Sequence, residues 1–322
     1  MPLKRVAIIV IHLHGFEVTH HCLLSLQASG CTDFDVVLVD NGSSDGSGEQ
    51  LEAAHPEAVV LRSEVNTGFT GGNNLGLVYA LEQGYEMVLL LNNDTYVANG
   101  FLNLLVRYLD THPETAAVQP KIYFHHDPQL LWSAGSYYNQ VLGFTYTRGL
   151  NKKDQPAFQQ PCAVDWISGC AMLIRTSVLR RTGLFAPNMF LYFEDVDLSF
   201  RLRKLGYRLA YVPASAIYHI AGASGKKEGQ KNTVQPFVYY YNLRNRIWML
   251  KKYSAWYLLP TVVLANGAYI FALMGYFLLR GRTPKFRAVL RAMKDGIKGQ
   301  IQDPSGVSYL RVAAPHEEAG LA

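Results

Sequence analysis

Four short runs of apolar, mostly β-branched or leucine residues constrain the fold of this 322-residue chain more than any other feature. The runs occupy residues 6–11, 36–39, 58–61 and 87–91, and stretches with helical patterning lie between them, near residues 18–29, 47–54 and 73–83. Strands that are apolar at every position are buried on both faces, as in a parallel sheet covered by helices. The sequence therefore predicts an α/β fold.

Polar clusters follow the end of each predicted strand, at residues 12–14, 40–46, 66–76 and 92–94. In open α/β sheets, ligands bind beside the carboxyl ends of the strands. We therefore expect a ligand site at this edge of the sheet.

The middle of the chain has a less regular pattern. Residues 120–165 are rich in aromatic residues, Gly and Pro, and we interpret them as short strands and loops that cover the cleft. A compact apolar segment follows at 167–175, then a helix at 176–182 and an acidic cluster that leads into a helix ending near Gly206. A further strand is expected at 207–212.

Two of the strand-end clusters have features of a nucleotide site. Asp40 begins the sequence DNGSSDG, where a carboxylate can accept hydrogen bonds from a nucleobase or ribose; a polar loop that caps a helix is the alternative. The Gly-rich stretch 66–76 opens a helix whose N-terminus could face a phosphate. It lacks the GxGxxG spacing, and no such loop follows the first strand, which disfavours a dinucleotide-binding dehydrogenase.

Candidate metal and acid–base residues follow later strands. Asp94 ends an Asn-Asn-Asp triplet after an apolar strand, where it could hold Mg²⁺ or Mn²⁺ beside a diphosphate; a simple turn is the alternative. Glu194, Asp195 and Asp197 open a helix, where acids interact favourably with the helix dipole or supply a general base. His219 could ligate a metal or be structural.

Six stretches, taken together and in order, resemble the family-2 glycosyltransferases, in particular their bacterial rhamnosyltransferase-like members. These stretches are VDNGSSDG (39–46), NTGFTGGNNLG (66–76), LNND (91–94), WISGCAMLIR (166–175), FLYFEDVDLSFRLR (190–203) and YHIAGAS (218–224). The resemblance covers roughly residues 5–225. It implies a GT-A fold, a nucleotide-diphosphate sugar donor, a divalent metal (Mn²⁺ or Mg²⁺) and inversion at the anomeric carbon.

The resemblance also implies roles for individual residues. Asp94 and His219 match metal ligands, and Asp195 matches the catalytic base, with Glu194 beside it. The residues implied to bind the donor are Asp40, Asn66, Gly71, Gly72, Asn73, Asn74, Asn92 and Asn93. The residues implied to face the donor sugar and the acceptor are Trp166, Ser168, Gly169 and Cys170.

Two positions depart from the family pattern. The first strand is followed by His12-Leu13-His14-Gly15 where the family usually has a Tyr-Asn-type sequence. Asn92 stands where many members have the first aspartate of a DxD motif, so Asp94 is the single carboxylate of this triplet.

The charge is divided between two parts of the chain. Residues 226–300 hold fourteen Lys and Arg against only Glu228 and Asp295, a local charge of +12, although the whole chain carries +5. Residues 254–279 carry no formal charge, and 256–279 would form a helix of about 36 Å, long enough to cross a bilayer. Basic flanks on both sides favour a re-entrant hairpin or an interfacial helix over a single crossing.

Further along, five apolar residues recur at helical spacing among Lys and Arg: Phe286, Val289, Leu290, Met293 and Ile297. This is the pattern of an amphipathic helix on anionic lipid; a helix packed on the catalytic domain, or a dimer contact, is the alternative. The sequence YYYNLRNR at 239–246 joins the two regions and could place an Arg near the diphosphate, or form a solvated helix face.

We therefore expect a GT-A catalytic domain over 1–225 and a helical, membrane-associated segment over 226–322, at the cytoplasmic face of a bacterial membrane. The four cysteines have no CxxC spacing, as expected in a reducing compartment. The expected partners are a nucleotide-sugar donor such as dTDP-rhamnose, a glycan or glycolipid acceptor, the membrane surface and a second copy of the chain in a homo-oligomer; no nucleic acid is expected. The alternatives are a UDP-hexose or UDP-galactofuranose transferase, and a non-catalytic scaffold on the same fold.

Overall fold

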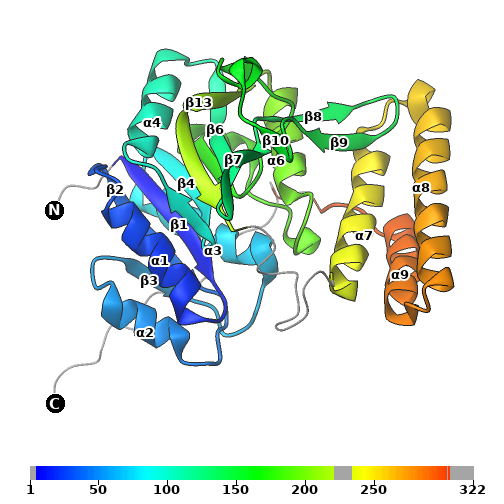
Figure 1. The fold of residues 1–322 in the computed structure, drawn as a ribbon, viewed down its shortest axis with the longest axis horizontal. Helices are drawn as coiled ribbons and strands as arrows, with labels where there is room; N and C mark the ends of the chain where they lie inside the picture. Colours follow the sequence, from blue (N-terminus) through cyan, green and yellow to red (C-terminus); the bar gives the residue numbers. More distant parts are fainter. Residues whose placement is uncertain (1–4, 221–233, 303, 305–322) are drawn as a thin grey trace.

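A mixed β-sheet forms the centre of the molecule (Figure 1). The computed structural model describes residues 5–220, 234–302 and 304. The four predicted strands are present and parallel, in the spatial order β3-β2-β1-β4. Their bounds are β1 Val6–His12, β2 Phe34–Asp40, β3 Val59–Arg62 and β4 Met87–Asn92. The first part of the fold prediction is thus confirmed.

Helices cover both faces of this sheet, because both faces are apolar. Ala7 and Ile9 of β1 belong to one core cluster, and Val6, Ile8 and Val10 to another on the opposite face. Helices α3, α5 and α6 pack into the first cluster, and α1, α2 and α4 into the second. Their bounds are α1 Phe16–Gln27, α2 Ser47–Ala54, α3 Gly68–Gln83, α4 Phe101–Thr111, α5 Thr176–Thr182 and α6 Glu194–Lys204.

Helix α3 begins five residues before its predicted start, inside the Gly-rich stretch. The glycines allow close contact with the sheet: a Cβ on Gly76 would lie 2.7 Å from the side chain of Ile9, and one on Gly72 would lie 3.2 Å from Asn41 and Ile11. These glycines therefore let a helix pack closely on β1 and β2.

The sheet is mostly parallel, as predicted, and its antiparallel pairs begin beyond β4. β12 (Ala171–Arg175) runs antiparallel to both β4 and β6 (Thr115–Phe124) and joins the two halves of the sheet. β13 (Arg208–His219) lies parallel to β6 and antiparallel to β5 (Thr95–Val97), and it continues seven residues beyond the strand predicted at 207–212. An apolar run reports burial and carries no information about strand direction.

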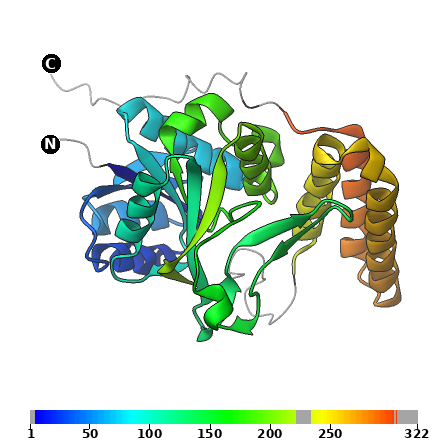
Figure 2. The ribbon, with the colours of Figure 1, turned by 90° about the horizontal axis from the view of Figure 1, so that it is seen from above.

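Residues 120–165 form the predicted short strands and loops, although β6 belongs to the central sheet. A two-stranded hairpin, β8 and β9, reaches from this region towards the C-terminal helices (Figures 1 and 2). The bounds are β7 Asp127–Ser133, β8 Ser136–Asn139, β9 Phe144–Thr147, β10 Lys152–Lys153, η1 Pro156–Phe158, β11 Cys162–Ala163 and η2 Pro187–Met189.

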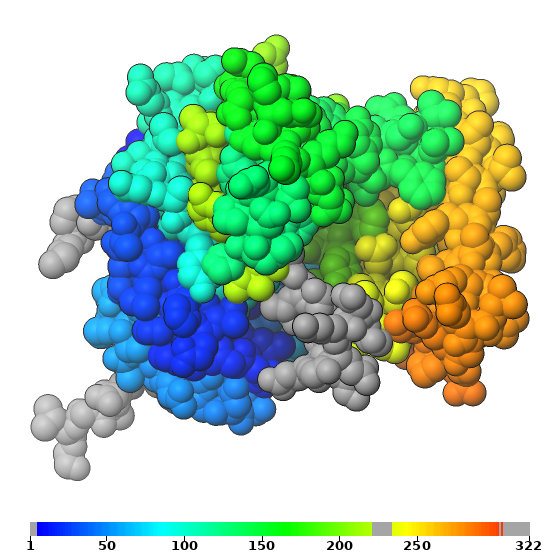
Figure 3. Space-filling view, viewed as in Figure 1, coloured from blue at the N-terminus to red at the C-terminus, as the bar shows by residue number. Residues whose placement is uncertain are grey.

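Three helices, which we call the tail, form one end of the molecule (Figures 1 and 3). They are α7 Pro236–Tyr253, α8 Leu259–Leu279 and α9 Thr283–Lys298, with a short η3 at Trp256–Leu258. The apolar segment is one continuous helix, so the predicted re-entrant hairpin is wrong. Pro260 does not break α8 because it lies in the first turn, where no intrahelical donor is needed.

The tail packs on the rest of the protein. Trp248 and Met249 of α7 share a core cluster with Met189 and Val196. Phe286, Val289 and Met293 of α9 pack against α7 and α8, whereas the alternative interpretation expected packing on the catalytic domain or on a second copy. Leu290 and Ile297 are exposed. The proposed domain boundary at residue 225 lies outside the described residues.

Candidate active site

The two predicted metal ligands lie in contact at the edge of the sheet. Asp94 follows β4, and His219 is the last residue of β13, where it pairs with Thr95. The His219 Nε2 atom lies 3.0 Å from the Asp94 Oδ1 atom, and both side chains are buried. Pairing between β5 and β13 therefore joins residues that are far apart in the sequence.

The environment of His219 favours its charged form. Burial lowers the pKa of His219, but the adjacent Cys170 and the carboxylate of Asp94 outweigh burial and raise that pKa to about 10. The edge of the His219 ring contacts Trp132, with ring centroids 4.9 Å apart. Its Nδ1 atom is buried and has no hydrogen-bond partner among the described residues.

The predicted base, Asp195, lies in the same part of the site as Asp94 and His219. Its carboxylate accepts hydrogen bonds from the backbone N–H of Gly169 (2.9 Å) and of Val196 (2.8 Å). Burial raises the pKa of Asp195 to about 6, against the opposing effect of these N–H groups. Burial raises the pKa of Cys170 as well, and the charges of His219, Asp94 and Asp195 all act on its thiol. Cys170 follows Gly169, to which Asp195 is bonded, so the predicted base and the predicted metal ligands lie near the same cysteine.

The three acids of this segment have different environments. Glu194 is buried, its Oε2 atom has no hydrogen-bond partner, and burial together with Asp195 raises its pKa well above the usual value. Asp197 is fully buried but paired: its carboxylate binds Arg201 at 2.9 Å and Lys252 at 2.7 Å. Asp197 thus ties α6 to α7, and Glu194 and Asp195 are the two acids that remain for chemistry.

The loop after β2 is bonded to the start of α3. The buried Asp40 accepts a hydrogen bond from the Ser43 N–H at 3.0 Å, and a Cβ on Gly48 would lie 2.0 Å from its Oδ2 atom, so only glycine leaves room for this carboxylate. Asn41 accepts hydrogen bonds from Thr67 and donates one to the Gly68 carbonyl. No separate role for Asn41 is predicted from the sequence, although this residue lies within the quoted motif.

The predicted donor-binding amides of the Gly-rich stretch are used within the protein. Asn66 accepts from the Gly68 N–H at 2.9 Å, and Asn73 donates to the Phe69 carbonyl. Asn74 exchanges two hydrogen bonds of 3.0 Å with the backbone of Phe185. These contacts, with the close packing around Gly71 and Gly72, give the stretch an architectural role; contact with a donor stays a prediction.

The remaining predicted residues line the same edge. The Asn92 N–H donates to the Cys170 carbonyl at 2.9 Å, and Asn93 donates to Thr19 at 2.8 Å. Trp166 donates to the Tyr137 carbonyl, and Ser168 accepts from the Cys170 N–H. Those two contacts fix the loop that carries Gly169. Gly169 itself lies close to Phe69, since a Cβ added to this glycine would be 2.8 Å from the Phe69 ring.

The departure after the first strand has a structural explanation. His12 is fully buried, and its ring nitrogens contact Thr19 at 2.9 Å and Ser47 at 2.7 Å. Burial lowers the pKa of His12. This residue joins α1 to α2 and is not open to a ligand, whereas His14 is exposed near Asp45.

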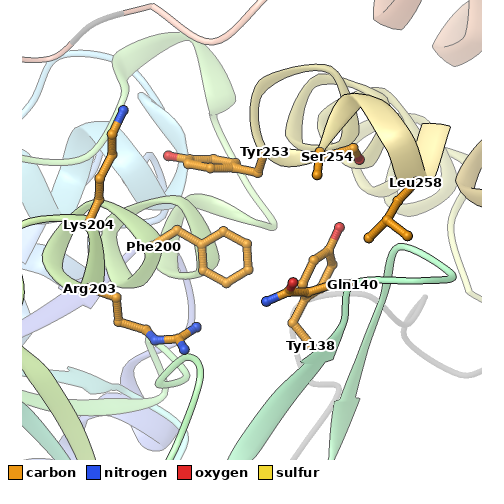
Figure 4. Close-up of a pocket in the computed structure, with 9 residues that line it drawn as sticks. Tyr138, Gln140, Phe200, Arg203, Lys204, Tyr253, Ser254 and Leu258 are labelled. Carbon is orange, nitrogen blue, oxygen red and sulfur yellow. The ribbon is translucent and has the colours of Figure 1, made fainter.

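A separate cavity of about 250 Å³ lies between the hairpin, the last turn of α6 and the end of α7 (Figure 4). Its walls include Tyr138, Phe200, Arg203, Lys204 and Tyr253. None of the predicted site residues lines it.

The side chains at the sheet edge fit a divalent cation only in part. Across residues 5–220, 234–302 and 304, no three His, Cys, Asp or Glu side chains are grouped so as to hold a metal ion. Asp94 and His219 would offer one oxygen and one nitrogen ligand, a set that suits Mn²⁺ when substrate phosphates complete the coordination. The unpartnered Nδ1 atom shows that the His219 ring is not fixed by bonds on both sides.

The parallel strands β3-β2-β1-β4, the antiparallel β12 inserted beside β4 and the acidic residues at their ends define a GT-A fold. Solved structures of this class overlay on the chain. Mannosyltransferase PcManGT from Pyrobaculum calidifontis, in complex with GDP-Man and Mn²⁺, covers 92% of this chain and 88% of its own at 16% identity, with a TM-score of 0.52. GalNAc-T7 with UDP, GalNAc and Mn²⁺ covers 77% of this chain and 48% of its own at 15% identity, with a TM-score of 0.58.

The chain belongs to glycosyltransferase-like family 2, which matches residues 4–235. It is similar to the N-acetylglucosaminyl-diphospho-decaprenol L-rhamnosyltransferase of Mycobacterium tuberculosis, at 25% identity over 74% of this chain and 81% of the relative. It is also similar to the rhamnosyltransferase WbbL of Escherichia coli K12, at 29% identity over 48% of this chain and 61% of the relative. The protein is thus a glycosyltransferase enzyme, which sets aside the non-catalytic scaffold.

Proposed function

We propose that this protein transfers a sugar, with inversion and with the help of a divalent metal, from a nucleotide-diphosphate donor to a hydroxyl of a lipid-linked or cell-surface glycan. The donor we favour is dTDP-rhamnose, because three relatives that match between 48% and 76% of this chain are named as rhamnosyltransferases. The observation that carries the proposal is the contact of Asp94 with His219 at the carboxyl edge of the sheet, with Asp195 bonded to the N–H of Gly169, the residue before Cys170.

Asp195 is the proposed base. Its carboxylate takes the proton of the acceptor hydroxyl while that oxygen forms a bond to the anomeric carbon and the bond to the departing diphosphate oxygen breaks. The elevated pKa of about 6 makes Asp195 a stronger base than an ordinary aspartate and leaves it largely ionised at neutral pH. The N–H groups of Gly169 and Val196 keep the carboxylate in one orientation.

Asp94 and His219 are the proposed metal ligands. A bound divalent cation would stabilise the negative charge that develops on the departing diphosphate. Because the raised pKa of His219 keeps its imidazole protonated, cation binding requires loss of that proton and should weaken at acid pH.

The donor nucleotide is proposed to lie along the loops after β2 and β3. Asp40 would bind the base or ribose, and the start of α3 would lie beside the phosphates, with Asn92 and Asn93 near the sugar-diphosphate linkage. Trp166, Ser168 and Gly169 would then face the sugar and the acceptor.

The tail is proposed to hold the enzyme on the cytoplasmic face of the membrane. Of the described helices, one (Trp256–Leu279) is long and apolar enough to cross a membrane by length and composition. Val262, Asn266, Ile270 and Phe277 are nevertheless buried along its whole length, so protein covers one side of α8. The other side exposes apolar residues, as expected for a helix that lies in the interface plane: Leu259, Val263, Leu264, Phe271 and Leu278.

The donor can be tested with purified enzyme, Mn²⁺ and a panel of nucleotide sugars. We expect dTDP-rhamnose to be hydrolysed slowly without acceptor and bound more tightly than UDP-glucose, UDP-galactose and UDP-galactofuranose. A clear preference for a UDP-sugar would contradict the rhamnose assignment and support the alternative donor. Absence of binding and turnover with every donor would contradict the whole proposal.

A further inference from the structure

The turn that leads into the two acids has an unusual backbone. Phe190, Tyr192 and Phe193 have positive φ angles of 66°, 70° and 70°, and Phe193 is the last residue before α6. Aromatic residues rarely adopt this conformation, because it is strained for a residue with a Cβ, and it persists only where the surroundings enforce it. Some part of the protein must therefore hold residues 188–193.

Asn245 of α7 supplies most of the restraint. This side chain is fully buried, and its Nδ2 atom lies within hydrogen-bond distance of three carbonyls of the turn. The distances are 2.9 Å to Met189, 2.9 Å to Leu191 and 2.7 Å to Tyr192. A single amide thus spans the turn immediately before Glu194 and Asp195.

Arg244 extends the same restraint. Its guanidinium donates to the carbonyls of Asn188 at 2.9 Å and Met189 at 2.8 Å, and to the Asn245 Oδ1 atom at 2.9 Å. It is covered by the ring of Trp248, whose centroid lies 4.3 Å away. Arg244 is therefore not free for the diphosphate, contrary to one interpretation of the sequence. Arg246 is not free either, because it binds Asn266 and the Gly143 carbonyl.

The turn also touches the start of α3. The Phe190 carbonyl accepts a hydrogen bond from the Thr70 N–H at 3.1 Å, and a Cβ on Gly68 would lie 2.5 Å from that oxygen. The ring of Phe190 stacks on Tyr241 of α7, with centroids 4.8 Å apart. One strained turn therefore connects the tail, the Gly-rich stretch and the acid pair.

We propose that Arg244 and Asn245 are positioning residues for catalysis: they hold the 188–193 turn so that Asp195 faces Gly169 and the start of α3 keeps its place. The inference rests on the proposed function, since it assigns the tail a part in the active site of that reaction. A misplacement of about 1 Å in a reacting group costs on the order of 10²-fold in rate.

The test compares two buried asparagines of the tail. Asn266 of α8 is a matched control, because it is also buried and its Nδ2 atom also donates to backbone carbonyls, those of Leu142 and Val262. We expect Asn245→Ala to lower kcat about 100-fold with the donor KM within about threefold. Asn266→Ala should lose comparable thermal stability and keep kcat within about threefold.

Arg244→Lys and Arg244→Met form a second pair. Lysine keeps a charged donor that can reach a carbonyl, so it should retain more kcat than methionine at similar donor KM. Equal activity of the two variants would assign Arg244 a packing role only.

Hydrogen exchange gives a readout that does not depend on turnover. Peptides covering 188–197 should exchange faster in Asn245→Ala than in the wild type, and should be unchanged in Asn266→Ala. Unaltered exchange, or a kcat deficit shared by both asparagine variants, would overturn the inference. Failure of the proposed function would look different, because the wild type itself would turn over no nucleotide sugar.

Discussion

The edge of the sheet and the tail bury polar groups in opposite ways. At the edge of the sheet, Glu194 and His219 each keep a buried atom without a hydrogen-bond partner, and the pKa values of Glu194, Asp195 and His219 are all raised. In the tail, the buried side chains of Asn245 and Asn266 are bonded to protein at several atoms.

This difference distinguishes side chains that are available to a ligand or a reaction from side chains that hold the backbone in place. A buried polar group without a partner costs about 1–3 kcal/mol, and use of that group by a ligand or a reaction is one reason for a protein to retain it; a raised pKa at the same residue supports that reason for Glu194 and His219. A fully bonded group holds a backbone in place and has little capacity left for a ligand. We infer from this contrast that the tail provides rigidity and that the sheet edge provides the reacting groups.

Substitution of Asp195, the proposed base, is the most direct test of this contrast. Asp195→Asn should lower kcat by about 10³-fold, because general-base catalysis contributes on the order of 10²–10⁴-fold. Nucleotide binding, measured by calorimetry, should stay within about threefold of the wild type. A variant that retains turnover would mean that another group removes the proton.

Removal of a metal ligand should have the next largest effect. His219→Ala deletes one of the two proposed ligands, so the apparent Kd for Mn²⁺ should rise about 10- to 100-fold. The measurement is a Mn²⁺ titration of activity and of nucleotide binding, with a chelator wash before it. His21→Ala, at an exposed histidine, is the control and should match the wild type. Equal metal dependence in all three proteins would remove His219 from the metal site.

The pH dependence should reveal the perturbed acid. With the pKa of Asp195 raised to about 6, kcat should fall about tenfold per unit below pH 6 and level off above it. Between pH about 4 and 6 the folded chain holds more protons on Asp195 than the unfolded chain, so this residue's contribution to stability falls as pH rises. Asp195→Asn should flatten that part of a Tm-versus-pH curve. An acid limb centred near pH 4 would contradict the elevated pKa.

The smallest effect concerns the outer surface of the tail. Arg287→Gln should weaken binding to vesicles containing anionic lipid about fivefold, since each basic residue near the surface contributes about 1 kcal/mol. Leu264→Ser should weaken it by removing exposed apolar surface. Arg107→Gln and Leu24→Ser, exposed positions on α4 and α1, are the controls for co-sedimentation at low and high salt. Equal losses in test and control variants would exclude this face of the tail as the membrane contact.

The course of the chain through the first sheet was predictable because it depends on local patterns. The strands Val6–His12 and Met87–Asn92 consist largely of apolar residues that are buried on both faces, and such runs predict strands without knowledge of their neighbours. The polar residues after those strands followed directly, since strand ends of a parallel sheet share one edge. The motifs then indicated the family without any knowledge of contacts.

Tertiary structure decided what those residues touch. The antiparallel insertion of β12 and the contact of Asp94 with His219 depend on strand pairing, which apolar periodicity does not encode. The separate environments of Asp195 and Asp197 depend on partners in other elements, such as Lys252.

The sequence by itself thus determined the family, the strand order along the chain and the residue types of the site. Only the folded molecule decided that Asn245 of a segment set apart as a membrane tail holds the turn before the acids. The physical reason is that hydrogen bonding and burial depend on distance in space, whereas a sequence pattern records distance along the chain.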